Sequence, residues 1–147
     1  MKKRFIWTAL FAAFTVFIFC RSLKSADEST MESAGIVSFI VGWVERLFSS
    51  PPENLADFVT VIVRKLAHIA EFAVQSVLAC KMFTVYELNL KKCLSWILLI
   101  GLMTACVDEA IQLTSPGRAG LITDVFIDFA GTALGFMVCY IFNRKKA

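Results

Sequence analysis

Four long apolar stretches alternate with polar links along this chain. They cover residues 5–20, 58–83, 93–113 and 121–142. A helix needs about 20 consecutive, mostly apolar residues to cross the hydrocarbon core of a bilayer, and each stretch approaches or exceeds that length. The pattern therefore predicts an all-α membrane protein, built as a bundle of four transmembrane helices.

The first stretch follows a basic segment, Met1-Lys2-Lys3-Arg4, as the apolar part of a signal peptide does. Signal peptidase requires small residues before its cleavage point, whereas bulky Phe17, Ile18 and Phe19 precede Cys20. We therefore expect an uncleaved anchor helix. No internal repeat or Gly/Ser-rich linker interrupts the chain, which favours a single domain over residues 1–147.

The link between the first two stretches also has a helical pattern. Its apolar residues fall on one face of a helix, with polar residues opposite: Ile36, Phe39, Ile40, Trp43 and Leu47. A helix of this kind lies in the membrane interface or packs over the bundle. We expect Pro51-Pro52 to end this amphipathic helix, and Asn54 or Asp57 to cap the next one.

The composition agrees with a membrane protein. Hydrophobic residues make up 58% of the chain and charged residues 18%, with a mean hydropathy of +0.70, whereas about a quarter of the residues in a soluble domain are charged. The five cysteines are odd in number and have no paired spacing. We expect them to pack in the apolar spans rather than to form disulfides or a zinc knuckle.

Basic residues cluster in three parts of the chain. They precede the first span, lie between the second and third, and follow the fourth: Lys2, Lys3, Arg4, Lys81, Lys91, Lys92, Arg144, Lys145 and Lys146. The link at residues 21–57 carries six acidic and three basic residues instead. The positive-inside rule therefore predicts a multi-pass protein of the cell membrane with both termini in the cytoplasm. The net charge of +3 is explained by this topology, so no nucleic-acid partner is predicted.

Polar residues inside the spans follow helical spacing. In the second span, Arg64, His68, Glu71 and Gln75 share one face, with Lys65 beside it. The third span ends with Asp108, Glu109 and Gln112, and the turn after it holds Arg118. The fourth begins with Asp124 and Asp128, and Gly131 and Gly135 continue that face as a Gly-x-x-x-Gly contact for another helix. Because each charge costs about 2.5–3.5 kcal/mol at the bilayer centre, we expect these groups to meet one another in the outer third of the bundle.

These motifs resemble the VanZ-like family of small bacterial membrane proteins, whose founding member is associated with low-level resistance to the glycopeptide teicoplanin. The resemblance rests on three segments: Arg64-Lys65-Leu66-Ala67-His68 with Glu71-Phe72, Asp108-Glu109-Ala110-Ile111-Gln112 leading to Pro116-Gly117-Arg118, and Asp124-Val125 with Asp128, Gly131 and Gly135. A weaker match lies at Arg21-Ser22-Leu23-Lys24-Ser25. It implies a role in the cell envelope, such as handling outer-face wall precursors or limiting antibiotic access.

Several functions fit this pattern. The charges could simply pair and hold the helices in register. Alternatively, they form a binding site for the polar head of an envelope lipid or lipid-linked wall precursor, in which arginines contact phosphate and carboxylates hold the arginines. The candidate binding residues are Arg64, Lys65, His68, Asp108, Glu109, Gln112, Arg118, Asp124 and Asp128. A protein of this kind would act as an accessory factor without catalysis.

An enzyme is the main alternative. His68 and Glu109 would then be the acid–base residues acting on a lipid headgroup, with or without a metal held by Asp108, Asp124 or Asp128. No known catalytic or metal-binding motif is present, so we predict no cofactor or metal. A proton-coupled transporter is disfavoured because the inner parts of the last two spans are apolar, although homo-oligomers formed through Gly131 and Gly135 could alter that.

Overall fold

A computed structural model describes residues 1–48 and 52–144 of the chain. Within these ranges there are five helices: α1 (Lys2–Ser22), α2 (Ala26–Leu47), α3 (Leu55–Val85), α4 (Leu90–Gln112) and α5 (Ile122–Arg144). Of these, α1, α3, α4 and α5 are long and apolar enough to cross a membrane. The predicted all-α fold with four transmembrane helices is confirmed.

Three of these helices begin earlier than their apolar stretches. α1, α3 and α4 begin at Lys2, Leu55 and Leu90 rather than at residues 5, 58 and 93. A helix continues into polar flanking residues because its backbone groups must stay paired up to the edge of the hydrocarbon. The N-terminus of α4 is capped by Asn89, whose side chain accepts a hydrogen bond of 2.9 Å from the amide of Lys91. α5 begins one residue later than predicted and ends at Arg144 rather than at residue 142.

The predicted cap of α3 is wrong in its detail. Asn54 stands at the N-cap position, but its side chain makes no capping hydrogen bond. Asp57 lies inside the first turn of the helix, where a carboxylate interacts favourably with the positive end of the helix dipole. Of the two prolines expected to end α2, Pro51 lies outside the described residues. α2 itself ends at Leu47.

α2 is longer than the apolar pattern predicted. It begins at Ala26 with a capping box: Ser25 Oγ accepts a hydrogen bond of 3.2 Å from the Glu28 amide, and the Glu28 carboxylate accepts one of 2.8 Å from the Ser25 amide. The hydrogen bond from the Ser25 backbone lowers the pKa of Glu28. The apolar side chains predicted on one face of α2 are mostly exposed, among them Ile36, Phe39 and Trp43.

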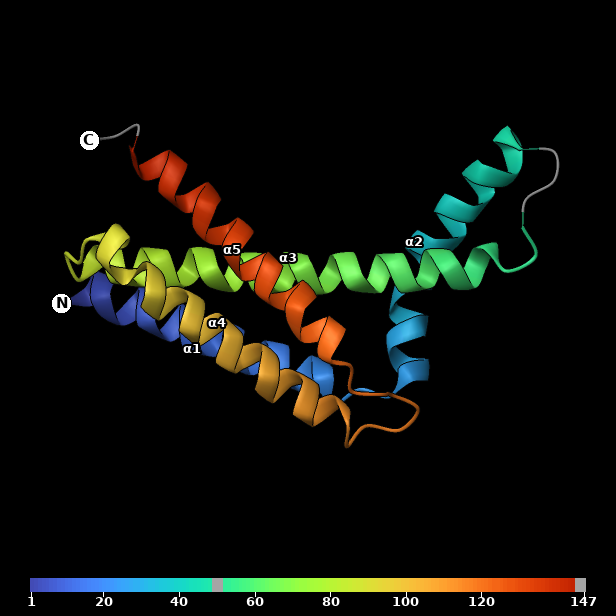
Figure 1. Cartoon of the computed structure of the whole chain (residues 1–147), viewed down its shortest axis with the longest axis horizontal. Helices are drawn as coiled ribbons and strands as arrows, with labels where there is room; N and C mark the ends of the chain where they lie inside the picture. Colours follow the sequence, from blue (N-terminus) through green and yellow to red (C-terminus); the bar gives the residue numbers. More distant parts are fainter. Residues whose placement is uncertain (49–51, 145–147) are drawn as a thin grey trace.

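The long helix α3 is the axis of the molecule (Figure 1). α5 crosses it and makes its most extensive contact, while α1 and α4 also pack on α3 and α2 crosses its N-terminal part. Gly131 and Gly135 allow the close approach of α5. A Cβ atom on Gly131 would stand 2.5 Å from the carbonyl oxygen of Ile69, and one on Gly135 would collide with the backbone of Ala73.

The two ends of the bundle differ. The start of α1, the turn between α3 and α4, and the end of α5 lie at one end, which we call the termini end (Figure 1). There, Arg4 donates hydrogen bonds of 3.1 Å to the Val85 carbonyl and to the Glu87 carboxylate. At the opposite end, which we call the polar end, α1 and α4 finish and α5 begins.

Candidate functional site

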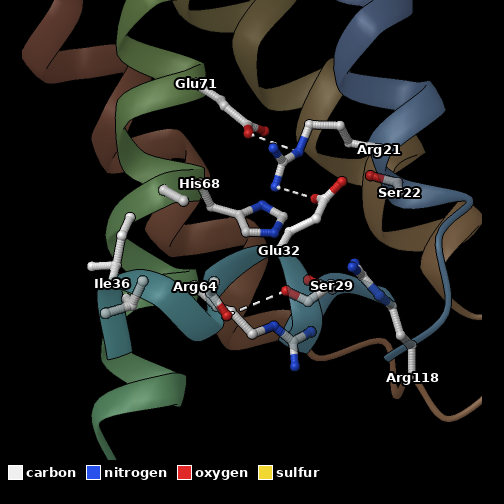
Figure 2. Close-up of a pocket in the computed structure, with 12 residues that line it drawn as sticks. Arg21, Ser22, Ser29, Glu32, Ile36, Arg64, His68, Glu71 and Arg118 are labelled. Atoms are coloured by element: carbon white, nitrogen blue, oxygen red, sulfur yellow. Dashed lines mark hydrogen bonds and ion pairs between the residues drawn. The ribbon is translucent and has the colours of Figure 1, made fainter. Parts of the chain in front are cut away.

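Residues from every helix meet at the polar end. Figure 2 shows Arg21 and Ser22 from α1, Glu32 from α2, Arg64, His68 and Glu71 from α3, and Arg118 from the loop before α5 around one cavity of about 150 Å³. A second cavity of about 240 Å³ shares Arg64, His68 and Arg118 with the first. Its wall also includes Lys65, Gln112, Asp124 and Asp128. The intramembrane charges therefore meet at one end of the bundle, as their spacing predicted.

His68 lies against two buried aspartates. Its Nδ1 is 3.4 Å from an oxygen of Asp128 on α5 and 4.0 Å from an oxygen of Asp108 on α4. The Asp108 and Asp128 side chains are 0% and 1% exposed, whereas that of His68 is 25% exposed. Of these three residues, His68 is therefore the one that lines both cavities.

Asp108 is held in place by neighbours on two helices. One of its oxygens accepts a hydrogen bond from the hydroxyl of Ser22, and the other accepts one of 2.9 Å from the Gln112 amide. Ser22 is fixed in turn, because its carbonyl oxygen accepts a hydrogen bond of 2.8 Å from the hydroxyl of Ser115. α1, α4 and the loop after α4 are thus tied together through one buried carboxylate.

The other acids have partners that the sequence analysis did not assign. Glu71 lies 3.0 Å from Arg21, whose second contact is Glu32 at 3.6 Å. Lys65 and Asp124 form an ion pair of 2.6 Å. The expectation that carboxylates hold Arg64 and Arg118 is therefore wrong, because Arg21 and Lys65 lie closer to these acids and pair with them instead.

Glu109 is held by the backbone at the start of α5. Its carboxylate accepts a hydrogen bond of 2.5 Å from the amide of Leu121, and the residue is 6% exposed. It belongs to the lining of neither cavity. Of the two acid–base candidates, the structure therefore brings only His68 to the cavities, while Glu109 holds the start of α5 against α4.

Arg64 and Arg118 are the cations of the two cavity walls that have no carboxylate partner among the described residues. Among the described residues, neither guanidinium takes part in an ion pair or donates a hydrogen bond, and Nε of Arg118 is buried without a partner. Burial lowers the pKa of Arg118, and the nearby charge of Arg64 lowers it further. Both arginines line both cavities, so the walls carry unpaired positive charge.

The sequence analysis missed part of the site on α1 and α2. Arg21 and Ser22 lie beyond the first apolar stretch, and Ser29 and Glu32 precede the apolar face by which α2 was recognised. Two signals were available in the sequence. The Ser-x-x-Glu spacing from Ser25 to Glu28 is typical of a helix N-terminus, and the segment around Ser22 belonged to the weaker part of the family resemblance.

The fold and site define a multi-pass helical membrane protein with a polar pocket enclosed by its spans and by a fifth helix. Residues 5–143 match the sequence model of the VanZ/LLP1 family. Because the match covers nearly the whole chain, the protein belongs to the VanZ-like family. No curated protein and no solved structure matched the chain.

Proposed function

We propose that the protein binds the phosphate-bearing head of an envelope lipid or lipid-linked wall precursor at the polar end. The observation that carries the proposal is the pair Arg64 and Arg118, which line both cavities without a carboxylate partner among the described residues. Both arginines are half-buried and Nε of Arg118 is fully buried, and a guanidinium that has lost water needs an anion or hydrogen-bond acceptors. Its planar set of donors matches two oxygens of a phosphate.

The paired charges around the two arginines support this role. Glu71 and Asp124 pair with Arg21 and Lys65 respectively, so these two carboxylates are balanced within the protein. Arg64 and Arg118 are then the cations of both cavity walls that have no carboxylate partner among the described residues. Exposed apolar side chains line the cavities as well, Ile36 of α2 the first and Val61 of α3 the second, so acyl or prenyl chains would stay among apolar side chains while the head enters.

Binding of matched lipids tests the proposal. Purified protein in nanodiscs of neutral lipid should bind a polyprenyl phosphate and not the corresponding polyprenol. Arg64→Gln and Arg118→Gln should each weaken binding by about ten- to a hundredfold, since hydrogen bonds to charged groups contribute about 1.5–3 kcal/mol. Arg46→Gln is the matched control, because Arg46 is exposed on α2 and lines neither cavity. Equal binding of the alcohol, or an equal loss in the control, contradicts the proposal.

The proposed orientation places both termini in the cytoplasm and the polar end at the outer leaflet. The basic residues of the termini end, among them Lys2, Lys3, Lys91 and Lys92, support it through the positive-inside rule. Labelling of single cysteines introduced at Glu87 and Ala119 in intact cells distinguishes the two faces. Reagents that cannot cross the membrane should react at position 119 and not at position 87.

Within the VanZ-like family, a lipid-binding accessory factor is consistent with an effect on glycopeptide susceptibility. Deletion of the gene should raise susceptibility to teicoplanin-type antibiotics, and the wild-type gene should restore resistance. Arg118→Ala should fail to restore it at equal membrane abundance. Full restoration of resistance by Arg118→Ala would show that the resistance phenotype does not depend on the proposed binding site.

A second candidate function has one observation in its favour. His68 stands 3.4 Å from Asp128 and lines both cavities, and a histidine oriented by a carboxylate is the usual arrangement of a general base. A membrane-embedded enzyme acting on a lipid headgroup would turn over polyprenyl phosphates or phospholipids. Unchanged lipids after prolonged incubation with folded protein that binds them would exclude this alternative for those substrates.

A further inference from the structure

Three residues at the polar end lie close enough together to be ligands of one metal ion. His68 Nδ1 and one carboxylate oxygen each from Asp108 and Asp128 all lie within 4.8 Å of one another. Two atoms bound to the same Zn²⁺ at about 2.0–2.2 Å in tetrahedral geometry stand about 3.4 Å apart. The distance from His68 Nδ1 to Asp128 is 3.4 Å, and that to Asp108 is 4.0 Å.

Asp128 gives the independent reason to expect a ligand. The residue is 1% exposed, and both of its carboxylate oxygens are buried without a hydrogen-bond partner among the described residues. A buried carboxylate without hydrogen bonds is costly, and such groups in proteins are paired or coordinate metals. His68 alone reaches one of these oxygens, at a distance longer than a hydrogen bond, whereas a cation between the three side chains would satisfy them directly.

The surroundings of Asp108 fit the same role. Carboxylates that bind metals are usually oriented by hydrogen bonds from a second layer of residues. The hydroxyl of Ser22 and the amide of Gln112 each donate to one oxygen of Asp108, and each oxygen keeps a further lone pair. Charge also balances, since two carboxylates and a neutral imidazole match the charge of a divalent cation.

We propose that His68, Asp108 and Asp128 bind one divalent transition-metal cation. Mixed imidazole and carboxylate ligands favour Zn²⁺ or Mn²⁺ over Mg²⁺, which prefers oxygen ligands and retains its water. Three protein ligands leave a coordination position open, as in catalytic zinc sites. His68 and Asp128 line the larger cavity together with Arg64 and Arg118, so that position faces the space where the phosphate is proposed to bind.

Metal content of the purified protein tests this inference. After treatment with EDTA and reloading with Zn²⁺ or Mn²⁺, the wild type should hold one ion per chain by elemental analysis. Asp128→Asn and His68→Gln should lose that ion. Asp124→Asn should keep it, because Asp124 lies one turn away on α5 and pairs with Lys65. A folded wild type without stoichiometric metal, or unchanged stoichiometry in Asp128→Asn, overturns the proposal.

Two further measurements test the metal site if Asp128→Asn does not fold. Co²⁺ bound to the wild type should give visible d–d absorption bands, which His68→Gln should lose; identical bands in folded His68→Gln refute coordination by His68. Arg118→Gln should keep the metal while losing affinity for polyprenyl phosphate. The metal site and the proposed lipid site can therefore fail separately.

Discussion

The termini end and the polar end of the bundle use the same four spans but different side chains. Near the termini end, the core consists of small and aliphatic residues from α3, α4 and α5: Ala79, Cys80, Cys93, Ile97 and Cys139. None of these cysteines forms a disulfide among the described residues. At the polar end, the buried residues include Ser22, Asp108, Gln112 and Asp128. Dispersion and close packing stabilise the first region, whereas hydrogen bonds and ion pairs stabilise the second.

The glycine contact joins the two regions. Gly131 and Gly135 of α5 stand against the backbone of Ile69 and Ala73 on α3. Asp128 lies one turn before Gly131, and His68 precedes Ile69. The closeness of the two helix backbones therefore sets the 3.4 Å separation of His68 and Asp128. The close packing of α3 and α5 therefore also positions His68 and Asp128 relative to each other.

The largest stability effect is expected at the polar end, for Ser22→Ala. This change removes the hydroxyl donor to buried Asp108, and hydrogen bonds to charged groups contribute about 1.5–3 kcal/mol. Unfolding by SDS in mixed micelles should show that loss of free energy. The control is Ser38→Ala, since the exposed Ser38 hydroxyl donates only to the Gly35 carbonyl of its own helix. Equal effects of the two substitutions would contradict a special role of the Asp108 network.

A slightly smaller effect is expected for Gly135→Ala, in the close contact between α3 and α5. The added methyl would collide with the Ala73 backbone, which cannot rotate away, and overpacking costs about 1–3 kcal/mol. Gly42→Ala is the matched control, because a Cβ there meets no atom within 4 Å. Alanine is favoured over glycine in a helix by about 1 kcal/mol, so the control should be neutral or stabilising. A stable Gly135→Ala variant would show that the glycines do not set the helix separation.

The sequence predicted the spans and the meeting of their charges for a simple reason. Hydrocarbon excludes charge, so the spacing of Arg64, His68 and Asp128 on their helices nearly fixes which faces turn inward. Individual pairings were not predictable, because Arg21, which pairs with Glu71, lies beyond the first apolar stretch and meets α3 only in the folded bundle. The sequence also gave no metal motif, since His68, Asp108 and Asp128 come from three helices and meet only in the folded bundle.

The smallest effect is expected between the two regions, at Gln75. Its amide donates hydrogen bonds of 2.9 Å to the Thr15 hydroxyl and 3.2 Å to the Thr104 hydroxyl. Both hydroxyls also donate to carbonyls of their own helices, so Gln75→Leu leaves neither donor unpaired. Hydrogen bonds between membrane helices contribute about 0.6 kcal/mol each on average, so the loss of both should lower the unfolding free energy by about 1 kcal/mol. Ser76→Ala, which removes a buried hydroxyl without a partner among the described residues, should cost nothing. If Gln75→Leu lowers the free energy of unfolding as much as Ser22→Ala does, the polar network continues to the middle of the bundle, and the two halves have no boundary between them.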